Sequence, residues 1–463
     1  MRKNAKPFPY GFDSMTRSRP SPLRFALPLA LAVTLVAGGA SGEDLLQIYR
    51  EAQASDPQLA AARANWGATQ ERVPQARAGL LPNVAFGSSV NINSFDSTFR
   101  GDPKVRNNNE FGQLGVTISA SQPLYRAQSV VALAQAQEQV VQSDYNLAIS
   151  QQDLILRTAV AYFDVLLAEF TVELVEQQKL AVDEQLAQAK RNFEVGTATI
   201  TDTNEAQAQY DRIVANEIQA RNDLDRRRTA LRAIIGRFPR DLNRVRRPFE
   251  PQLPNPNSLE HWLERALADN LVVRVTRASY DIAALEVDRA RAAYYPTVDL
   301  VASYGLSGST GGGSTNANSD QRSGLFGLQL NVPLYQGGII TSRVREAVAL
   351  QERARQDVEF ARRNAVTGAQ DGFSGINSAA ASVKAFEQAL VSADTALQSN
   401  RLGQEVGIRT NLDVLNVQQN VFSVRRDLAN AYFQYLLAIL RLKAAVGTLT
   451  EADLIEINRY LTV

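Results

Sequence analysis

The chain has 463 residues, and its 49 Lys and Arg nearly balance its 48 Asp and Glu, for a formal net charge of +1. It has no cysteine, which excludes disulfides, thiolate metal sites, cysteine nucleophiles and a lipidated cysteine. A chain without excess charge or a basic stripe is a poor nucleic-acid binder, so we expect no nucleic-acid partner.

The first 42 residues have the layout of a secretory signal peptide. An apolar run at residues 25–37 follows three arginines and precedes small residues through Gly42. A helix that spans a bilayer needs about 20 apolar residues, and neither this run nor any later stretch reaches that length. We expect cleavage after Gly42, with Met15 as an alternative start. The exported remainder is then either soluble or held in a membrane by strands.

The two halves of the chain echo each other. Glu194-Val195-Gly196 recurs as Glu405-Val406-Gly407, and Gln122-Pro123-Leu124-Tyr125 recurs as Val332-Pro333-Leu334-Tyr335, at an offset of about 211 residues. The sequence therefore predicts an internal duplication. Its parts are a signal peptide (1–42), a first repeat (43–236), a proline-rich equatorial linker (237–258), a second repeat (259–447) and a C-terminal equatorial segment (448–463).

Each repeat contains one pair of predicted strands, in which apolar residues alternate with small or polar ones. The predicted strands are residues 83–93 and 112–124 in the first repeat, and 296–307 and 324–335 in the second. Alternation alone favours a half-buried sheet in a soluble protein, because such sheets are commoner. The connections at 94–110 and 308–323 are long and polar, and such loops are typical of outer-membrane barrels.

Four strands are too few to close a water-filled barrel, and an open strand edge in lipid is not tolerated. Other copies of the chain must therefore complete the barrel, and three copies supply twelve strands. The predicted fold class is a mixed α/β membrane protein: a trimeric 12-stranded β-barrel, with four strands per protomer, continued by a long antiparallel α-helical coiled-coil tube.

The tube is predicted from two long segments without helix breakers. Residues 127–193 contain neither proline nor glycine, and residues 339–402 contain no proline. At a rise of about 1.5 Å per residue each reaches roughly 100 Å. Their apolar residues recur at steps of four and three, which is coiled-coil spacing.

Each long helix is expected to turn back at a valine-glycine pair. Gly196 and Gly407 suit the left-handed residue that ends many helices. Thr201, Asp202 and Asn411 offer side-chain caps for the returning helices. Each half is therefore a helical hairpin with its tip far from the strands.

Several of these segments resemble the TolC family of outer-membrane efflux proteins. Residues 193–236 and 405–449 resemble the two tips with their returning helices. Residues 43–49 (EDLLQIY) resemble the mature start, and residues 333–338 (PLYQGG) resemble the strand-to-helix junction. The likeness spans essentially residues 43–454, and the missing lipidation cysteine fits the TolC branch better than the lipoprotein branch.

The resemblance implies a homotrimer in the cell outer membrane with a large periplasmic portion. It implies an exit duct of tripartite efflux pumps or type I secretion systems, which carries small molecules or proteins. The implied partners are outer-membrane lipid, a periplasmic adaptor (membrane fusion) protein and an inner-membrane RND, MFS or ABC transporter. Docking of the adaptor at the tips would open the periplasmic end.

Two alternatives remain open. One is a trimeric structural scaffold of the envelope without transport, and the other is a type I duct dedicated to one secreted protein. The sequence contains no nucleophile elbow, metal-spaced histidine pair or phosphate loop, so we expect no enzyme activity, no cofactor and no metal.

The resemblance also carries gate residues over by position. Asp202 and Arg409 match the carboxylate and guanidinium that tie neighbouring protomers shut in the family, and Thr201 sits beside Asp202. The alternative for Asp202 is a helix cap without a gating role, and for Arg409 an exposed tip residue.

Other positions of the gate depart from the family pattern. Gln185 matches a further link residue, but the family's tyrosine is Gln404 here and its glutamate opposite Gln185 is Arg401. At the implied constriction Asp413 keeps the first of two aspartates, while Asn416 replaces the second, so a trimer would present three carboxylates rather than six. The alternative for Asp413 is that it caps or solvates a helix start. The implied adaptor contacts are Val195, Gly196, Thr197, Val406, Gly407 and Ile408.

Overall fold

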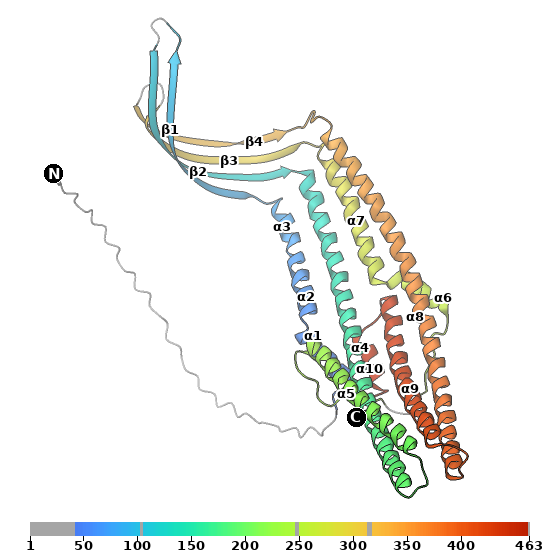
Figure 1. The fold of residues 1–463 in the computed structure, drawn as a ribbon. Helices are drawn as coiled ribbons and strands as arrows, with labels where there is room; N and C mark the ends of the chain where they lie inside the picture. The colour runs from blue at the N-terminus through green and yellow to red at the C-terminus, as the bar shows by residue number, and fades with distance from the viewer. Residues whose placement is uncertain (1–41, 102–104, 246–249, 313–316, 462–463) are drawn as a thin grey trace, which may run out of the picture. The chain divides into compact units, whose positions relative to one another are not determined.

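The computed structural model describes residues 42–101, 105–245, 250–312 and 317–461. Its contacts divide the chain into Met1–Ser41 and Gly42–Val463, and everything below concerns the second unit (Figure 1). The predicted signal peptide lies outside the described residues, except for Gly42.

Four antiparallel strands form one sheet in the order β1-β2-β3-β4. They are β1 (Asn83–Phe99), β2 (Val105–Tyr125), β3 (Thr297–Gly312) and β4 (Ala317–Asn331). The pairing of β1 with β2 continues to Phe99 and Val105, and that of β3 with β4 to Gly312 and Ala317.

The strands therefore occupy most of residues 94–110 and 308–323, so the prediction of long polar connections there was wrong. Backbone groups form the ladder whatever the side chains are, so the pairing extends through these polar stretches of sequence. At its other end β4 stops at Asn331, before the predicted limit of residue 335. Pro333 lacks the N–H that a continued ladder needs.

The helices repeat one pattern in both halves. They are α1 (Leu45–Ser55), α2 (Pro57–Gln70), α3 (Arg72–Ala78), α4 (Ala127–Glu194), α5 (Ile200–Ile235), α6 (Leu259–Asp269), α7 (Leu271–Ala292), α8 (Ile339–Glu405), α9 (Asn411–Val446) and α10 (Glu451–Asn458). The long helices α4 and α8 have 68 and 67 residues, and the returning helices α5 and α9 have 36 each. Figure 1 shows α4, α7 and α8 side by side below the sheet, with the α4/α5 and α8/α9 hairpins ending at the opposite end of the unit.

The main buried core lies between these two ends, where α1, α6 and α10 join the middle of α4 and the upper part of α9. Phe163 of α4 stacks on Phe433 of α9 with ring centroids 5.5 Å apart. Around them Tyr162, Leu436 and Leu440 are fully buried. We call this region the equatorial core.

Two buried tyrosines fasten the irregular segments to this core. The hydroxyl of Tyr162 donates toward the carbonyl oxygens of Glu43 at 3.1 Å and Asn243 at 2.9 Å. The hydroxyl of Tyr435 lies 2.7 Å from both the N–H and the carbonyl oxygen of Gln252, and burial raises its pKa to about 12. The start of the unit and the proline-rich linker are thus both held by the core.

We expect Tyr162→Phe to destabilise the protein by about 1–3 kcal/mol, because the buried carbonyl of Asn243 loses this donor, while the carbonyl of Glu43 keeps the Asn243 N–H at 3.1 Å. A thermal melt of the detergent-solubilised protein measures the effect as a lower midpoint. Tyr145→Phe on the same helix is the matched control, and its midpoint should stay near that of the wild type. Equal midpoints for the two variants would contradict this role of the Tyr162 hydroxyl.

Candidate functional site

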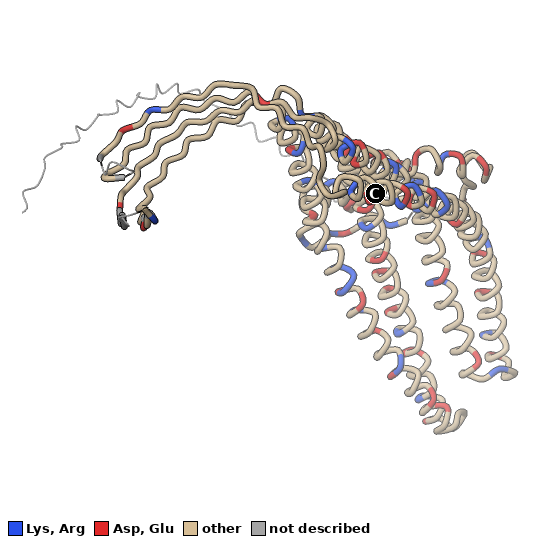
Figure 2. Tube along the Cα trace, turned by 90° about the horizontal axis from the view of Figure 1, so that it is seen from above, with Lys and Arg blue, Asp and Glu red and all other residues tan. Residues whose placement is uncertain are grey.

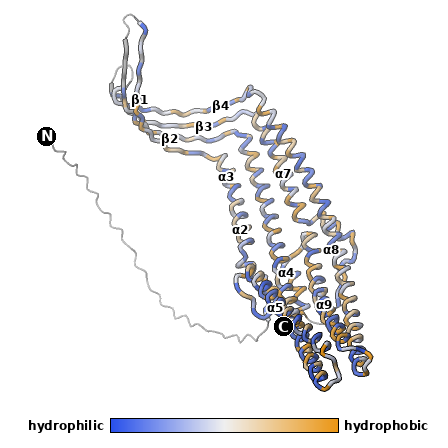
Figure 3. The backbone as a smooth tube through the Cα atoms, viewed as in Figure 1, coloured by the Kyte–Doolittle hydropathy of each residue, from blue (hydrophilic) through white to orange (hydrophobic). Residues whose placement is uncertain are grey.

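One face of the sheet is apolar and open. Ile92 is 87% exposed and Phe326 is 79% exposed. The same face carries other exposed large apolar side chains, at Val84, Phe86, Val90, Leu114, Ile118, Leu328 and Leu330. An apolar surface of this extent is expected where a protein meets a membrane or another chain. In Figure 3 hydrophobic positions recur along the strands, which agrees with the predicted alternation.

No helix in the described part of the chain is both long enough and apolar enough to cross a membrane.

An ion pair joins the sheet to the helices. Two of the three guanidinium nitrogens of Arg126, at the start of α4, donate to the Asp299 carboxylate of β3, with distances of 2.9 Å for Nε–Oδ1 and 2.8 Å for Nη2–Oδ2. Asp299 is 8% exposed and pairs in the ladder with Pro123, where the register of β2 shifts before Tyr125. The pair fixes the direction in which β2 becomes α4. Sequence analysis missed it, although a lone acid within an alternating strand was an available signal.

The two hairpin tips have the same backbone geometry. Gly196 and Gly407 have φ angles of +77° and +78°, so the predicted left-handed glycines are confirmed. At the first tip the N–H of Thr197 donates to the carbonyl of Asn192 at 2.8 Å, and at the second the N–H of Ile408 donates to that of Gly403 at 2.8 Å. Such bonds satisfy the last carbonyls of each long helix.

The returning helices begin with capping boxes, and the predicted caps were wrong. Thr199 and Thr410 are the N-caps, while Thr201, Asp202 and Asn411 lie inside the helices. The Asp202 carboxylate accepts from the Thr199 N–H at 2.8 Å, and Asp413 accepts from the Thr410 N–H at 2.9 Å. These backbone and hydroxyl donors lower the pKa of both aspartates, and Arg409 adds to the effect on Asp413. Both aspartates therefore stay ionised at neutral pH.

The predicted gate residues Asp202 and Arg409 lie at different tips. In the described part of one chain no ion pair joins them. The stem of Arg409 crosses Gly403, where an added Cβ would meet the Arg409 Cγ at 2.8 Å. Asp202 is half-buried, whereas Thr201 and Arg409 are exposed.

The remaining predicted positions have local surroundings of their own. The side-chain amide of Gln404 donates to Asn411 at 3.4 Å within the second tip, and Arg401 is exposed. Asp413 is half-buried at the start of α9, and Asn416 is exposed one turn later.

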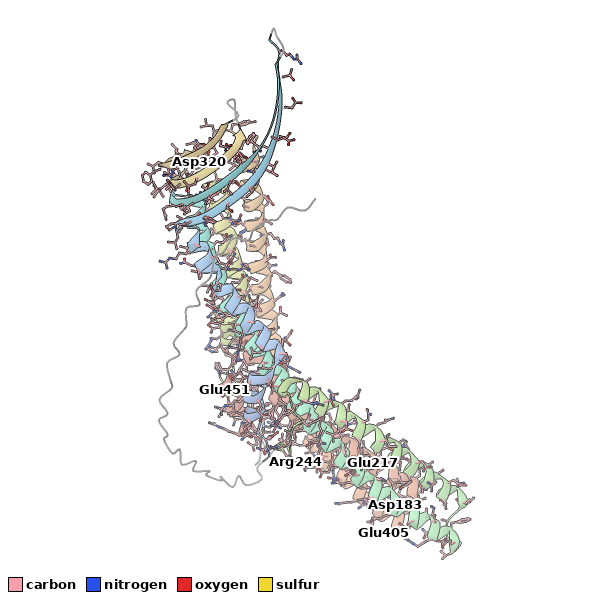
Figure 4. The ribbon with its side chains drawn as sticks, turned by 90° about the vertical axis from the view of Figure 1, so that its left-hand side faces the viewer. Asp183, Glu217, Arg244, Asp320, Glu405 and Glu451 are labelled. Carbon is pink, nitrogen blue, oxygen red and sulfur yellow. The ribbon has the colours of Figure 1, made fainter. Side chains whose placement is uncertain are left out.

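Gln185 makes a contact that sequence analysis missed. Its side-chain amide on α4 donates to Gln418 of α9 at 3.1 Å, so it links the two hairpins of one chain. Gln419 of α9 accepts from Arg212 of α5 at 2.7 Å. In Figure 4 the labelled Asp183, Glu217 and Glu405 mark the lower hairpins that these contacts join.

The six predicted adaptor contacts are all exposed at the tips. Val195 is 73% exposed and Ile408 is 79% exposed, with Val406 beside it. Figure 2 shows Lys, Arg, Asp and Glu distributed along the helices and few of them on the sheet. Among the described residues, no group of three or more His, Asp or Glu side chains is arranged to hold a metal ion.

The sequence of this chain matches known proteins over most of its length. The sequence profile of the family described as "Outer membrane efflux protein" matches residues 48–237 and 262–448. Outer membrane protein TolC of Vibrio cholerae is 34% identical over 440 residues, which cover 94% of this chain and 98% of that protein. Alkaline protease secretion protein AprF of Pseudomonas aeruginosa is 32% identical, with 89% of this chain and 85% of that protein covered.

Solved structures agree on the fold. A crystal structure of CusC, described in connection with transmembrane channel formation, superposes with a TM-score of 0.73 at 16% identity. The match covers 88% of this chain and 93% of that one. At this identity the likeness concerns the fold alone, which is the fold of outer-membrane channels.

Proposed function

The chain belongs to the outer membrane efflux protein family, and from that membership we propose that three copies form a gated channel, with the sheets closing one barrel and the hairpins one periplasmic tube. The protein is an outer-membrane exit duct of efflux or secretion systems. Its family and fold are those of channels without enzyme activity.

The proposal of a trimer is supported by the open edges of the four-stranded sheet. In one chain β1 and β4 are edge strands of a four-stranded sheet whose apolar face is exposed. Unpaired backbone groups in lipid are not tolerated, so β4 of one protomer must pair with β1 of the next. Three protomers would then supply twelve strands, enough to enclose a water-filled pore.

We expect the protein to run as a trimer in detergent, because each protomer leaves two strand edges unpaired. Native mass spectrometry measures the assembly directly. A stable folded monomer under the same conditions would rule out the shared barrel.

The tips are the proposed periplasmic entrance. Asp202 of one protomer and Arg409 of its neighbour would close it, with Thr201, Gln185 and Gln404 as further gate residues. Asp413 would form the constriction, with Asn416 leaving three carboxylates rather than six. We further propose that residues 1–42 are removed on export and that residues 43–236 and 259–447 are duplicated units.

The proposed partners are a periplasmic adaptor at Val195, Gly196, Thr197, Val406, Gly407 and Ile408, and beyond it an inner-membrane RND, MFS or ABC transporter. Exposed apolar side chains at the two tips support this docking site. The family is named for efflux, and one relative is named for the secretion of alkaline protease, so small molecules and proteins are both candidate cargo.

Conductance of the purified trimer in a planar lipid bilayer tests the function. A duct passes current with discrete single-channel steps, whereas the alternative of a structural scaffold passes none. Co-purification of the inner-membrane partner then separates a general efflux duct from a type I duct dedicated to one protein.

A further inference from the structure

Glu43, the first residue after the proposed signal peptide, has a partner for each polar group of its backbone. Its N–H donates to the carbonyl of Asp241 at 2.7 Å, and its carbonyl accepts from the Asn243 N–H at 3.1 Å. The Tyr162 hydroxyl donates to the same carbonyl at 3.1 Å. Glu43 thus pairs with Leu242 as in a parallel sheet, and this pairing joins it to the proline-rich linker.

The side chain of Glu43 is bound as well. One Nη atom of Arg237 donates to its Oε1 at 2.6 Å, and the Arg240 N–H donates to its Oε2 at 3.0 Å. The same guanidinium also donates to the Glu51 carboxylate at 2.7 Å. The side chains of Glu43, Glu51 and Arg237 therefore carry one negative charge in excess. A positive charge added beside them would be stabilised.

Glycine is the residue that fits directly before Glu43. A Cβ atom at position 42 would lie 2.5 Å from Oδ1 of Asn243, and 3.1 Å from both the Asn243 nitrogen and the Asp241 carbonyl oxygen. The first distance is too short for any carbon atom. The other two involve backbone atoms that cannot turn away, so a larger residue in place of Gly42 would displace the linker.

The amide oxygen of Asn243 points toward Gly42 and lacks a donor. Asn243 is 7% exposed, and its side chain makes no hydrogen bond with any described residue. A buried acceptor without a donor costs about 1–3 kcal/mol. Removal of Gly42 would empty the space between this oxygen and the Glu43 nitrogen, where an additional N–H group could reach it.

The same linker also binds the last described residue of the chain. Leu461 pairs antiparallel with Val245. Residues 242–245 therefore contact both ends of the unit, and Leu242 and Leu461 are both part of the equatorial core. A firmly bound terminus at Glu43 would complete this core.

We propose that the linker contains a binding site for the α-ammonium group that forms on Glu43 when the signal peptide is removed. A membrane peptidase hydrolyses the Gly42–Glu43 bond: water gives its hydroxyl to the Gly42 carbonyl carbon and its hydrogen to the Glu43 nitrogen, which is protonated at neutral pH. The Asp241 carbonyl and the Asn243 amide oxygen accept two of its N–H groups. The inference rests on the proposed removal of residues 1–42 and goes beyond the channel function.

The first test identifies the terminus and its reactivity. We expect the intact mass of the purified protein to be that of a chain that begins at Glu43. At neutral pH its α-amino group should react with an acylating reagent about tenfold more slowly than a free terminus, because charge-assisted hydrogen bonds must break first. Peptide mass spectrometry measures the rate, and Lys384, which is exposed on α8, is the internal reference.

Two extra glycines inserted between Gly42 and Glu43 supply the free terminus for comparison. Glycine fits before Glu43, so the contacts of Glu43 persist while the ammonium group moves out of the site. We expect this terminus to be acylated about tenfold faster than that of the wild type, with Lys384 reacting equally in both proteins. Equal rates for the two termini, or a wild-type mass that begins at another residue, would overturn the proposal.

Asn243→Leu tests the side-chain acceptor, because leucine keeps a similar volume and removes the amide oxygen. We expect its terminus to react at a rate between those of the wild type and the glycine-extended variant. Asn458→Leu is the matched control, because it also removes a buried amide oxygen without a donor, on α10. Its rate should stay at the wild-type value. Faster acylation in both variants, or in neither, would contradict the role of Asn243.

These measurements use the detergent-solubilised protein and do not depend on conductance. A duct that conducts normally while its terminus reacts freely would overturn the binding site alone. A trimer with a protected terminus and no current would contradict the duct alone.

Discussion

Replacing Gly196 or Gly407 with leucine is expected to abolish export while the trimer stays intact. Both glycines have φ angles near +78°, which side chains other than glycine adopt at a cost of about 1–2 kcal/mol. An added Cβ meets nothing within 4 Å at either position, so the packing of the hairpins is not disturbed. The backbone strain is therefore confined to the tip, which is the surface where we propose that the adaptor docks.

The measurement is drug resistance, or secretion of a reporter protein, in cells that carry the variant as their sole copy. Gly67→Leu is the matched control, because an added Cβ is equally free at Gly67, on α2, while its φ lies outside the left-handed region. We expect export to fall to the level of a deletion strain in both tip variants and to persist in the control. If the Gly407→Leu variant exports at the wild-type level, the second tip is not part of the docking site.

Sequence alone predicted the elements that depend on local patterns. Period-two alternation identified the four strands, and the two long runs without helix breakers gave the lengths of α4 and α8. The prediction of the N-cap residue was wrong at the first tip because the run from Thr197 to Thr203 contains several threonines and one aspartate. Each of them is a good cap, and the backbone path at Gly196 decides that Thr199 takes the position.

Contacts between distant segments were not predictable from one sequence. Gln185 and Gln418 are 233 residues apart, and Arg126 and Asp299 are 173 apart. The seam of a coiled coil restricts which helix faces meet, but it does not fix which turns of two hairpins lie side by side. A glutamine within a long polar stripe is therefore indistinguishable from its neighbours until the register is known.

The proposed gate contacts join neighbouring protomers, so no contact within one chain specifies them. Asp202 and Arg409 both lie at the hairpin tips, at the same end of the unit. In the proposed trimer, each would pair with the other residue from a neighbouring protomer. Within one chain Gln404 bonds to Asn411, and Gln185 bonds to Gln418. Two positions that hold links in the family are thus engaged inside the protomer.

The gate pair should consequently bear much of the closure between protomers. A partly exposed ion pair contributes about 0.2–1 kcal/mol. Three such pairs in one ring bias the gate by about 0.6–3 kcal/mol, which is about three- to 150-fold in open probability. We expect Asp202→Ala or Arg409→Ser to raise the open probability within that range, with the double variant less than additive.

A charge exchange and the pH dependence of opening distinguish a gate pair from a helix cap. Exchanging the charges, Asp202→Arg with Arg409→Asp, should restore much of the closure if the two side chains meet. The Thr199 N–H and hydroxyl lower the pKa of Asp202, so its charge, and with it the link, is present at neutral pH and is lost only as the pH falls through that lowered pKa. Single-channel recordings across acidic pH should then show opening in the wild type and no further change in Asp202→Ala. If the single variants conduct like the wild type, Asp202 serves only the capping box and closure resides in the packing of the coiled helices.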